Sequence, residues 1–159
     1  MKTRSKSGFT LVEILIVVVI LGILAAIVIP QFSEASSEAR VSSVKSNLQM
    51  VRSQIELYKI QHGDDLPIDI NDGTAQQLID ALTNKTLLDG TVDANGTYGP
   101  YMQKFPVNAV NDKGGLAAGI LIVDDTPDAA YNSADHGWIY DKSTGEFFAV
   151  DGTDDMCDW

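Results

Sequence analysis

The feature that most constrains this chain is an apolar run from Phe9 to Ile29 that contains a single carboxylate, Glu13. At ~1.5 Å per residue, a helix of this length spans about 31 Å, which matches the hydrocarbon core of a bilayer. An ionised carboxylate inside hydrocarbon costs roughly 2.5–3.5 kcal/mol even on lenient insertion scales. A plain membrane anchor has no use for that charge. We therefore expect Glu13 to meet a cation, and the most local candidate is a chain terminus created just before Phe9.

The residues on either side of the run predict its orientation and its fate. The first eight residues carry Lys2, Arg4 and Lys6 and no acid, so they should stay in the cytoplasm while everything after Pro30 faces outward. A secretory signal would place a small-residue cleavage site after the apolar run. The sequence there is PQF, so we expect the run to be retained. Pro30 also predicts a kink or local break in the helix near residues 28–30.

From about Ser33 to His62 the sequence reads as a continuation of this helix. Apolar residues recur at intervals of three and four, and charged residues occupy the other faces, which is the pattern of an amphipathic helix. The stripe consists of Val41, Val44, Leu48, Val51, Ile55 and Tyr58. We expect it to pack on the chain's own domain, with a coiled-coil seam as the alternative. Gly63 should cap this helix, and Pro67 should prevent its continuation.

The rest of the chain predicts short elements. A short amphipathic helix is expected within residues 71–84, with Thr74 as its N-cap. Residues 98–108 are expected to form a non-regular loop that packs by its aromatic side chains. Three short apolar runs are typical of strands, and a hairpin turn separates the last two: residues 119–123, 137–141 and 146–150. The fold class is therefore α+β, with a long N-terminal helix packed on a small antiparallel sheet.

The segment GFTLVE, from Gly8 to Glu13, followed by an apolar helix, resembles the class III signal of type IV pilins and type II secretion pseudopilins. The resemblance implies that a prepilin peptidase cuts between Gly8 and Phe9. It implies that the new Phe9 amine is N-methylated, and that Glu13 pairs with the Phe9 amine of a neighbouring subunit during assembly. In filaments of this family the helix often loosens, which here would fall between Gly22 and Pro30. An ordinary proline kink at the membrane boundary is the alternative.

The same resemblance implies a domain organisation, a location and partners. Residues 1–8 would be the leader, 9–30 the transmembrane and assembly helix, and 31–159 a periplasmic or extracellular globular domain of the pilin-like ladle shape. The chain would cross the bacterial inner membrane once, or form an extracellular filament if it is a true pilin. Its partners would be further copies of itself in a helical filament, the prepilin peptidase, an inner-membrane assembly platform, and minor pilins or pseudopilins.

Two features favour a secretion pseudopilin within this family. Cys157 is the only cysteine, so the two-cysteine loop that closes many surface pilins cannot form. The segment from Tyr58 to Pro67 is similar to the helix end of major pseudopilins. We therefore favour the major pseudopilin of a type II secretion system, with the major pilin of an extracellular type IV pilus as the alternative. From a different class, a single-pass anchored periplasmic binding module that never polymerises stays open, as does the role of Cys157.

Composition argues against several other classes of function. The formal charge of −11 leaves no basic stripe for nucleic acid. His62 and His136 are not in zinc-binding spacing, and no catalytic set or phosphate loop is present, so we expect no enzyme and no required cofactor. Pseudopilins are known for a calcium site in the C-terminal loop, and two acidic clusters could supply its oxygens, although solvated loops are the favoured interpretation. The candidate ligands are Asp124, Asp125, Asp128, Asp151, Asp154 and Asp155.

Overall fold

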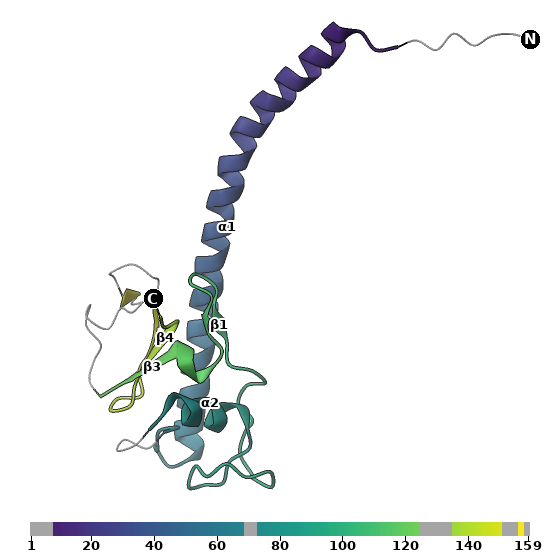
Figure 1. The fold of residues 1–159 in the computed structure, drawn as a ribbon. Helices are drawn as coiled ribbons and strands as arrows, with labels where there is room; N and C mark the ends of the chain where they lie inside the picture. The colour runs from purple at the N-terminus through teal and green to yellow at the C-terminus, as the bar shows by residue number, and fades with distance from the viewer. Residues whose placement is uncertain (1–7, 69–72, 125–134, 151–155, 158–159) are drawn as a thin grey trace, which may run out of the picture. The chain divides into compact units, whose positions relative to one another are not determined.

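The computed structural model describes residues 8–68, 73–124, 135–150 and 156–157 (Figure 1). The chain divides into two compact units, residues 1–39 and 40–159, which are described separately below. The long helix α1, Leu11–Gln61, contributes to both units.

The first unit is built on the N-terminal part of α1. Large apolar side chains from Phe9 to Ile29 are between 42% and 83% exposed, so none of them is buried by the described part of the chain. The helix continues without interruption through Gly22 and Pro30. Of the kink or local break that the sequence predicts near Pro30, the break is therefore wrong for this single chain, and the kink stays a prediction. A proline removes one backbone donor, and the apolar turns before and after it keep their helical conformation.

In the second unit, α1 buries the stripe that its sequence predicts. Its buried residues are Val44, Leu48, Val51, Ile55 and Tyr58, while Val41 at the start of the stripe is half-buried. Gly63 follows the helix with a φ of 70°. The N–H of Asp64 donates to the carbonyl oxygen of Lys59 at 2.8 Å. This bond closes a Schellman-type cap, so the predicted helix end is confirmed.

The short helix α2, Ala75–Thr83, begins at the predicted N-cap. The Thr74 hydroxyl accepts the Gln77 N–H at 3.3 Å, and the Gln77 side chain accepts the Thr74 N–H at 2.9 Å. This reciprocal pair is a capping box, which satisfies two donors that a helix start otherwise leaves free. Leu78 and Leu82 are buried beneath α2.

The main sheet contains the three predicted strands and one more, in the order β3-β4-β5-β6. Its strands are β3 Ile120–Val123, β4 Trp138–Asp141, β5 Phe147–Val150 and β6 Met156–Cys157. The β4–β5–β6 pairs are antiparallel as expected, whereas β3 and β4 run parallel, which makes the sheet mixed. A parallel pair needs a long connection, and the chain between Val123 and Trp138 supplies it. A smaller hairpin pairs β1 Val107–Asn108 with β2 Lys113–Gly114, and the short 3-10 helix η1 Ala117–Gly119 precedes β3.

One face of this sheet packs against the buried stripe of α1 (Figure 1). Trp138 and Phe147 stack with their ring centroids 5.3 Å apart, and both belong to the same apolar cluster as the α1 stripe. The Arg52 side chain reaches from α1 and donates to the Phe147 carbonyl oxygen at 2.8 Å. The predicted α+β fold, in which a long helix packs on a small sheet, is thus confirmed.

Candidate assembly site and membrane span

Thr10 and Glu13 form a reciprocal cap at the start of α1. The Glu13 carboxylate oxygen Oε2 accepts both the Thr10 N–H and the Thr10 hydroxyl at 2.8 Å, and the Glu13 N–H donates to the Thr10 hydroxyl oxygen at 3.2 Å. This is the Thr-x-x-Glu capping box, in which two otherwise unsatisfied backbone donors find partners. The sequence carries this signature in full, but only an intermolecular role was predicted for Glu13, and this local one was missed.

The second oxygen of the Glu13 carboxylate, Oε1, accepts no hydrogen bond from the described residues. Gly8 and Phe9 precede the helix and are exposed, with Phe9 at 83%. The arrangement therefore presents a carboxylate with one oxygen in use and one available, beside an exposed chain segment. A carboxylate in the first turn is also favoured by the partial positive charge of the helix N-terminus.

The helix that follows is long and apolar enough to cross a membrane by length and composition. None of its most apolar 18-residue window is buried inside the chain. An exposed apolar surface of this extent marks contact with lipid or with other proteins. Gly22 and Pro30 both lie in this helix, and a side chain added at Gly22 would meet no other atom within 4 Å. Their suggested part in filament assembly stays a prediction.

His62 is buried in the interior, where stacking and hydrogen bonds hold its ring. Its ring stacks on Tyr58 with centroids 3.8 Å apart, and it is 2% exposed. Its Nδ1 lies 2.9 Å from the Tyr58 carbonyl oxygen, so this nitrogen must carry the proton, and Nε2 accepts from the Thr86 hydroxyl at 2.9 Å. The predicted aromatic packing of the 98–108 loop is found here, because Tyr101 packs against Tyr58 and donates to the Gln61 side chain at 2.8 Å.

The calcium prediction falls mostly outside the described residues. Asp124 is exposed and pairs with the Lys142 ammonium at 2.7 Å. In the described part of the chain, no group of three or more His, Cys, Asp or Glu residues could hold a metal ion. The other five candidates all lie where the structure gives no description, so calcium stays a prediction: Asp125, Asp128, Asp151, Asp154 and Asp155.

A capped, exposed apolar helix on a small α+β domain defines a membrane-anchored, pilin-like structural subunit. The similarity of the chain to known proteins supports this class. Residues 3–29 match the family model of the prokaryotic N-terminal methylation motif. The chain is 34% identical over 108 residues to the type II secretion system core protein G of Pseudomonas aeruginosa, covering 68% of this chain and 70% of that protein.

Other relatives extend the likeness to both branches of this class. The type IV major fimbrial protein FimA of Dichelobacter nodosus is 36% identical over 126 residues, 74% of this chain and 72% of that protein. The core protein G of Aeromonas hydrophila is 34% identical over 85 residues, 54% of each chain. No solved structure matches the chain. The chain belongs to the family of type IV pilins and type II secretion pseudopilins.

Proposed function

We propose that this chain is the major pseudopilin of a type II secretion system. It would polymerise in the inner membrane into a helical filament whose globular domains face the periplasm. The observation that carries the proposal is the apolar surface from Phe9 to Ile29, which is exposed throughout and holds one acid in its first turn. A domain that only needed an anchor would gain nothing from that acid. The relatives named core protein G of type II secretion systems support the choice of machine.

The proposed mechanism has two steps. A prepilin peptidase cuts between Gly8 and Phe9, and the new Phe9 amine is methylated and keeps a positive charge. Apolar helices of neighbouring subunits then pack together and exchange lipid contacts for protein contacts. The Phe9 ammonium of one subunit meets Glu13 of the next, whose Oε1 is available while Oε2 stays in the cap. Because an unpaired charge in that packed core is costly, this pair fixes the axial register.

An extracellular type IV pilus is the second candidate, and one observation favours it. The match to the fimbrial protein FimA spans 74% of this chain, slightly more than the match to core protein G of Pseudomonas aeruginosa. Deleting the gene separates the two candidates. A pseudopilin mutant should stop exporting proteins into the culture medium while its surface filaments remain, and a pilin mutant should lose the surface filaments instead.

The first experiment is intact-mass and N-terminal peptide mass spectrometry on the protein from its native membrane. A chain that starts at a methylated Phe9 is the expected result. A chain that starts at Met1, or one that is cut after Ile29, would overturn the proposal and leave an anchored or secreted domain instead. The readout is independent of which machine the subunit serves, so it tests the processed pilin-like subunit itself.

A further inference from the structure

Two segments of the second unit match the acceptor pattern for N-linked glycans, Asn-x-Ser/Thr with x other than proline. They are NKT, which begins at Asn84, and NGT, which begins at Asn95. The proposed filament role uses neither segment. The pattern is short and recurs by chance, so the accessibility of its side chains decides whether it can act. The asparagine must offer its side-chain nitrogen, and the hydroxyl of the third residue must be open to the transferase.

The first segment is closed. Asn84 is the C-cap of α2, and its Nδ2 donates to the Asp80 carbonyl oxygen at 3.1 Å. The third residue, Thr86, is 0% exposed, and its hydroxyl donates to Nε2 of His62 at 2.9 Å. A transferase could reach this hydroxyl only after part of the core had opened. We therefore expect Asn84 to stay unmodified.

The second segment is open. Asn95 and Thr97 are both exposed, and neither side chain makes a hydrogen bond with the described part of the chain. The Asn95 N–H donates to Oδ1 of Asp93 at 2.7 Å, and the Gly96 N–H donates to the Asp93 carbonyl oxygen at 2.9 Å. These two bonds form a turn. Asn95 lies at its tip, with its side-chain amide in solvent.

The rest of the loop holds this turn in place. Thr86 forms isolated β-bridges with Val92 and with Tyr98, on either side of the turn. Gly96 is buried, and a Cβ added there would stand 2.6 Å from the Thr86 carbonyl oxygen. Glycine in the middle of the pattern therefore lets the turn pack closely on Thr86 while both of its neighbours stay exposed. Exposed loop residues positioned by a rigid scaffold commonly carry function.

We propose that Asn95 is the acceptor of an N-linked oligosaccharide, whose donor is a lipid-pyrophosphate-linked oligosaccharide. The inference rests on the proposed function in one respect, because the second unit must face away from the cytoplasm. In the transfer, a bond forms between Nδ2 of Asn95 and the anomeric carbon of the sugar, and the bond from that carbon to the pyrophosphate oxygen breaks. The lipid pyrophosphate leaves with the electron pair, and the amide nitrogen loses one proton to a base of the transferase.

The glycan has a consequence for the filament. A glycan is bulky and solvated, so the surface around Asn95 cannot also be a contact between subunits. The turn at residues 93–96 therefore faces solvent in the filament, and Asn95→Gln should leave the yield of filaments unchanged.

The test is mass spectrometry of intact glycopeptides from the full-length chain, taken from its native membrane. The peptide that contains Asn95 should carry the added mass of an oligosaccharide, and Asn95→Gln should remove that mass completely. Thr97→Val should remove it as well, although Asn95 is kept, because a methyl group replaces the hydroxyl. Thr97→Ser keeps a hydroxyl and should keep the glycan. Asn84→Gln is the matched control and should leave the added mass unchanged.

An unmodified Asn95 in the native protein would overturn the proposal, as would a glycan that survives Asn95→Gln or Thr97→Val. Conversion of Asn95 to aspartate alone, by spontaneous hydrolysis of its amide, would overturn it too. The N-terminal peptide of the same digest tests the proposed function separately. A methylated Phe9 beside an unmodified Asn95 would overturn only this inference. A chain that starts at Met1 and carries the glycan would overturn only the pilin-like processing.

Discussion

Glu13→Ala is the sharpest perturbation of this chain, because it removes the one acid from the exposed apolar surface. We expect the variant to insert into the membrane and to be cleaved before Phe9 as efficiently as the wild type. It should then fail to polymerise. Membrane insertion itself becomes easier without the carboxylate. A loss of filaments would therefore not result from a smaller number of inserted subunits.

The expected change in the critical concentration for assembly follows from two separate contributions, the charge of Glu13 and the helix cap. Leaving a buried charge without its partner costs about 3–5 kcal/mol, and each 1.4 kcal/mol is roughly a tenfold change in an equilibrium constant. The critical concentration for adding subunits should therefore rise by about a hundredfold or more. The cap contributes less, because losing a helix N-cap costs about 1 kcal/mol. Thr10→Val removes the hydroxyl, and with it two of the bonds between Thr10 and Glu13, but keeps the charge. Because the cap is present both before and after assembly, its loss should change the critical concentration by no more than about fivefold, which corresponds to ~1 kcal/mol.

The assay compares sheared filaments with processed subunit in the membrane fraction, over a series of expression levels. Glu34→Ala is the matched control, because Glu34 is an exposed acid on the same helix but outside the apolar span. It should assemble like the wild type. Wild-type assembly by Glu13→Ala would refute the charge pairing and would favour a module that does not polymerise. An equal loss in Thr10→Val would show that the cap, and not the charge, is what assembly requires.

Three further predictions concern the second unit, each measured on the full-length chain in detergent. Asn108→Ala should lower the free energy of unfolding in urea by about 2–4 kcal/mol, because its buried amide donates to the carbonyl oxygens of Gly137 and Val150 at 2.8 and 2.7 Å. Gly114→Ala should lower the midpoint of thermal unfolding by several degrees, because a Cβ at a φ of 90° would collide with the Trp138 indole. Although burial raises the pKa of Asp141, hydrogen bonds from Ser143 and Thr144 outweigh it and hold the pKa below its ordinary value. Such a carboxylate stabilises the fold above its unfolded pKa and loses that contribution as the pH falls through its folded pKa. The wild type should therefore lose unfolding free energy below about pH 4, and Asp141→Asn should lose less of it there, as urea unfolding between pH 3 and pH 7 would show.

The parts of the fold that sequence predicts well are those governed by local patterns. The spacing of Val44, Leu48 and Val51 is a property of the helix itself, so their burial could be predicted before any partner was known. Thr74 and Gly63 act on backbone groups within a few residues of themselves, and both caps were predicted for that reason. The capping box of Thr10 is equally local. It was not predicted because the charge of Glu13 was assigned to an intermolecular contact instead.

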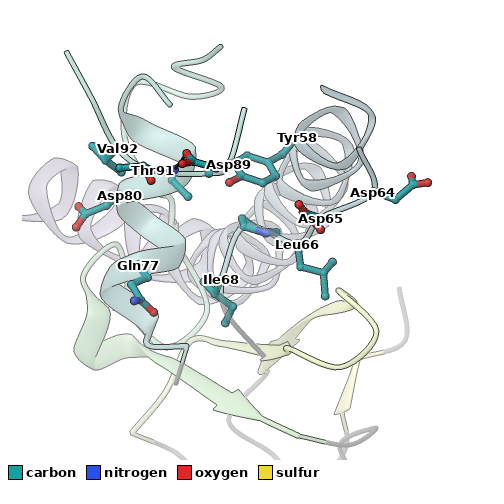
Figure 2. A pocket seen from close by; sticks show the side chains of 13 residues that line it. Tyr58, Asp64, Asp65, Leu66, Ile68, Gln77, Asp80, Asp89, Thr91 and Val92 are labelled. Atoms are coloured by element: carbon teal, nitrogen blue, oxygen red, sulfur yellow. Dashed lines mark hydrogen bonds between the residues drawn. The ribbon is translucent and has the colours of Figure 1, made fainter. Parts of the chain in front are cut away.

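Other features depend on segments that are far apart in the chain. An apolar run such as Ile120–Val123 indicates a buried strand but carries no information about its direction, so its parallel pairing with Trp138–Asp141 could not be predicted. The pocket lined by Tyr58, Asp89 and Gly90 (Figure 2) is formed in the same way. Tyr58 belongs to the helical stripe by its spacing, and only the folded chain brings Asp89 and Gly90 to its hydroxyl.

The cap at the start of α1 also bears on how one residue can serve both a single subunit in lipid and a filament. Before assembly, two donors of Thr10 already neutralise part of the cost of placing the Glu13 carboxylate in an apolar setting. Both donors use Oε2 of Glu13, so Oε1 can still accept a hydrogen bond. A neighbour's ammonium can therefore add to the cap without displacing it. Under the proposed pairing, the cap lowers the cost of the Glu13 carboxylate in the single subunit, and the neighbour's ammonium lowers it further in the filament.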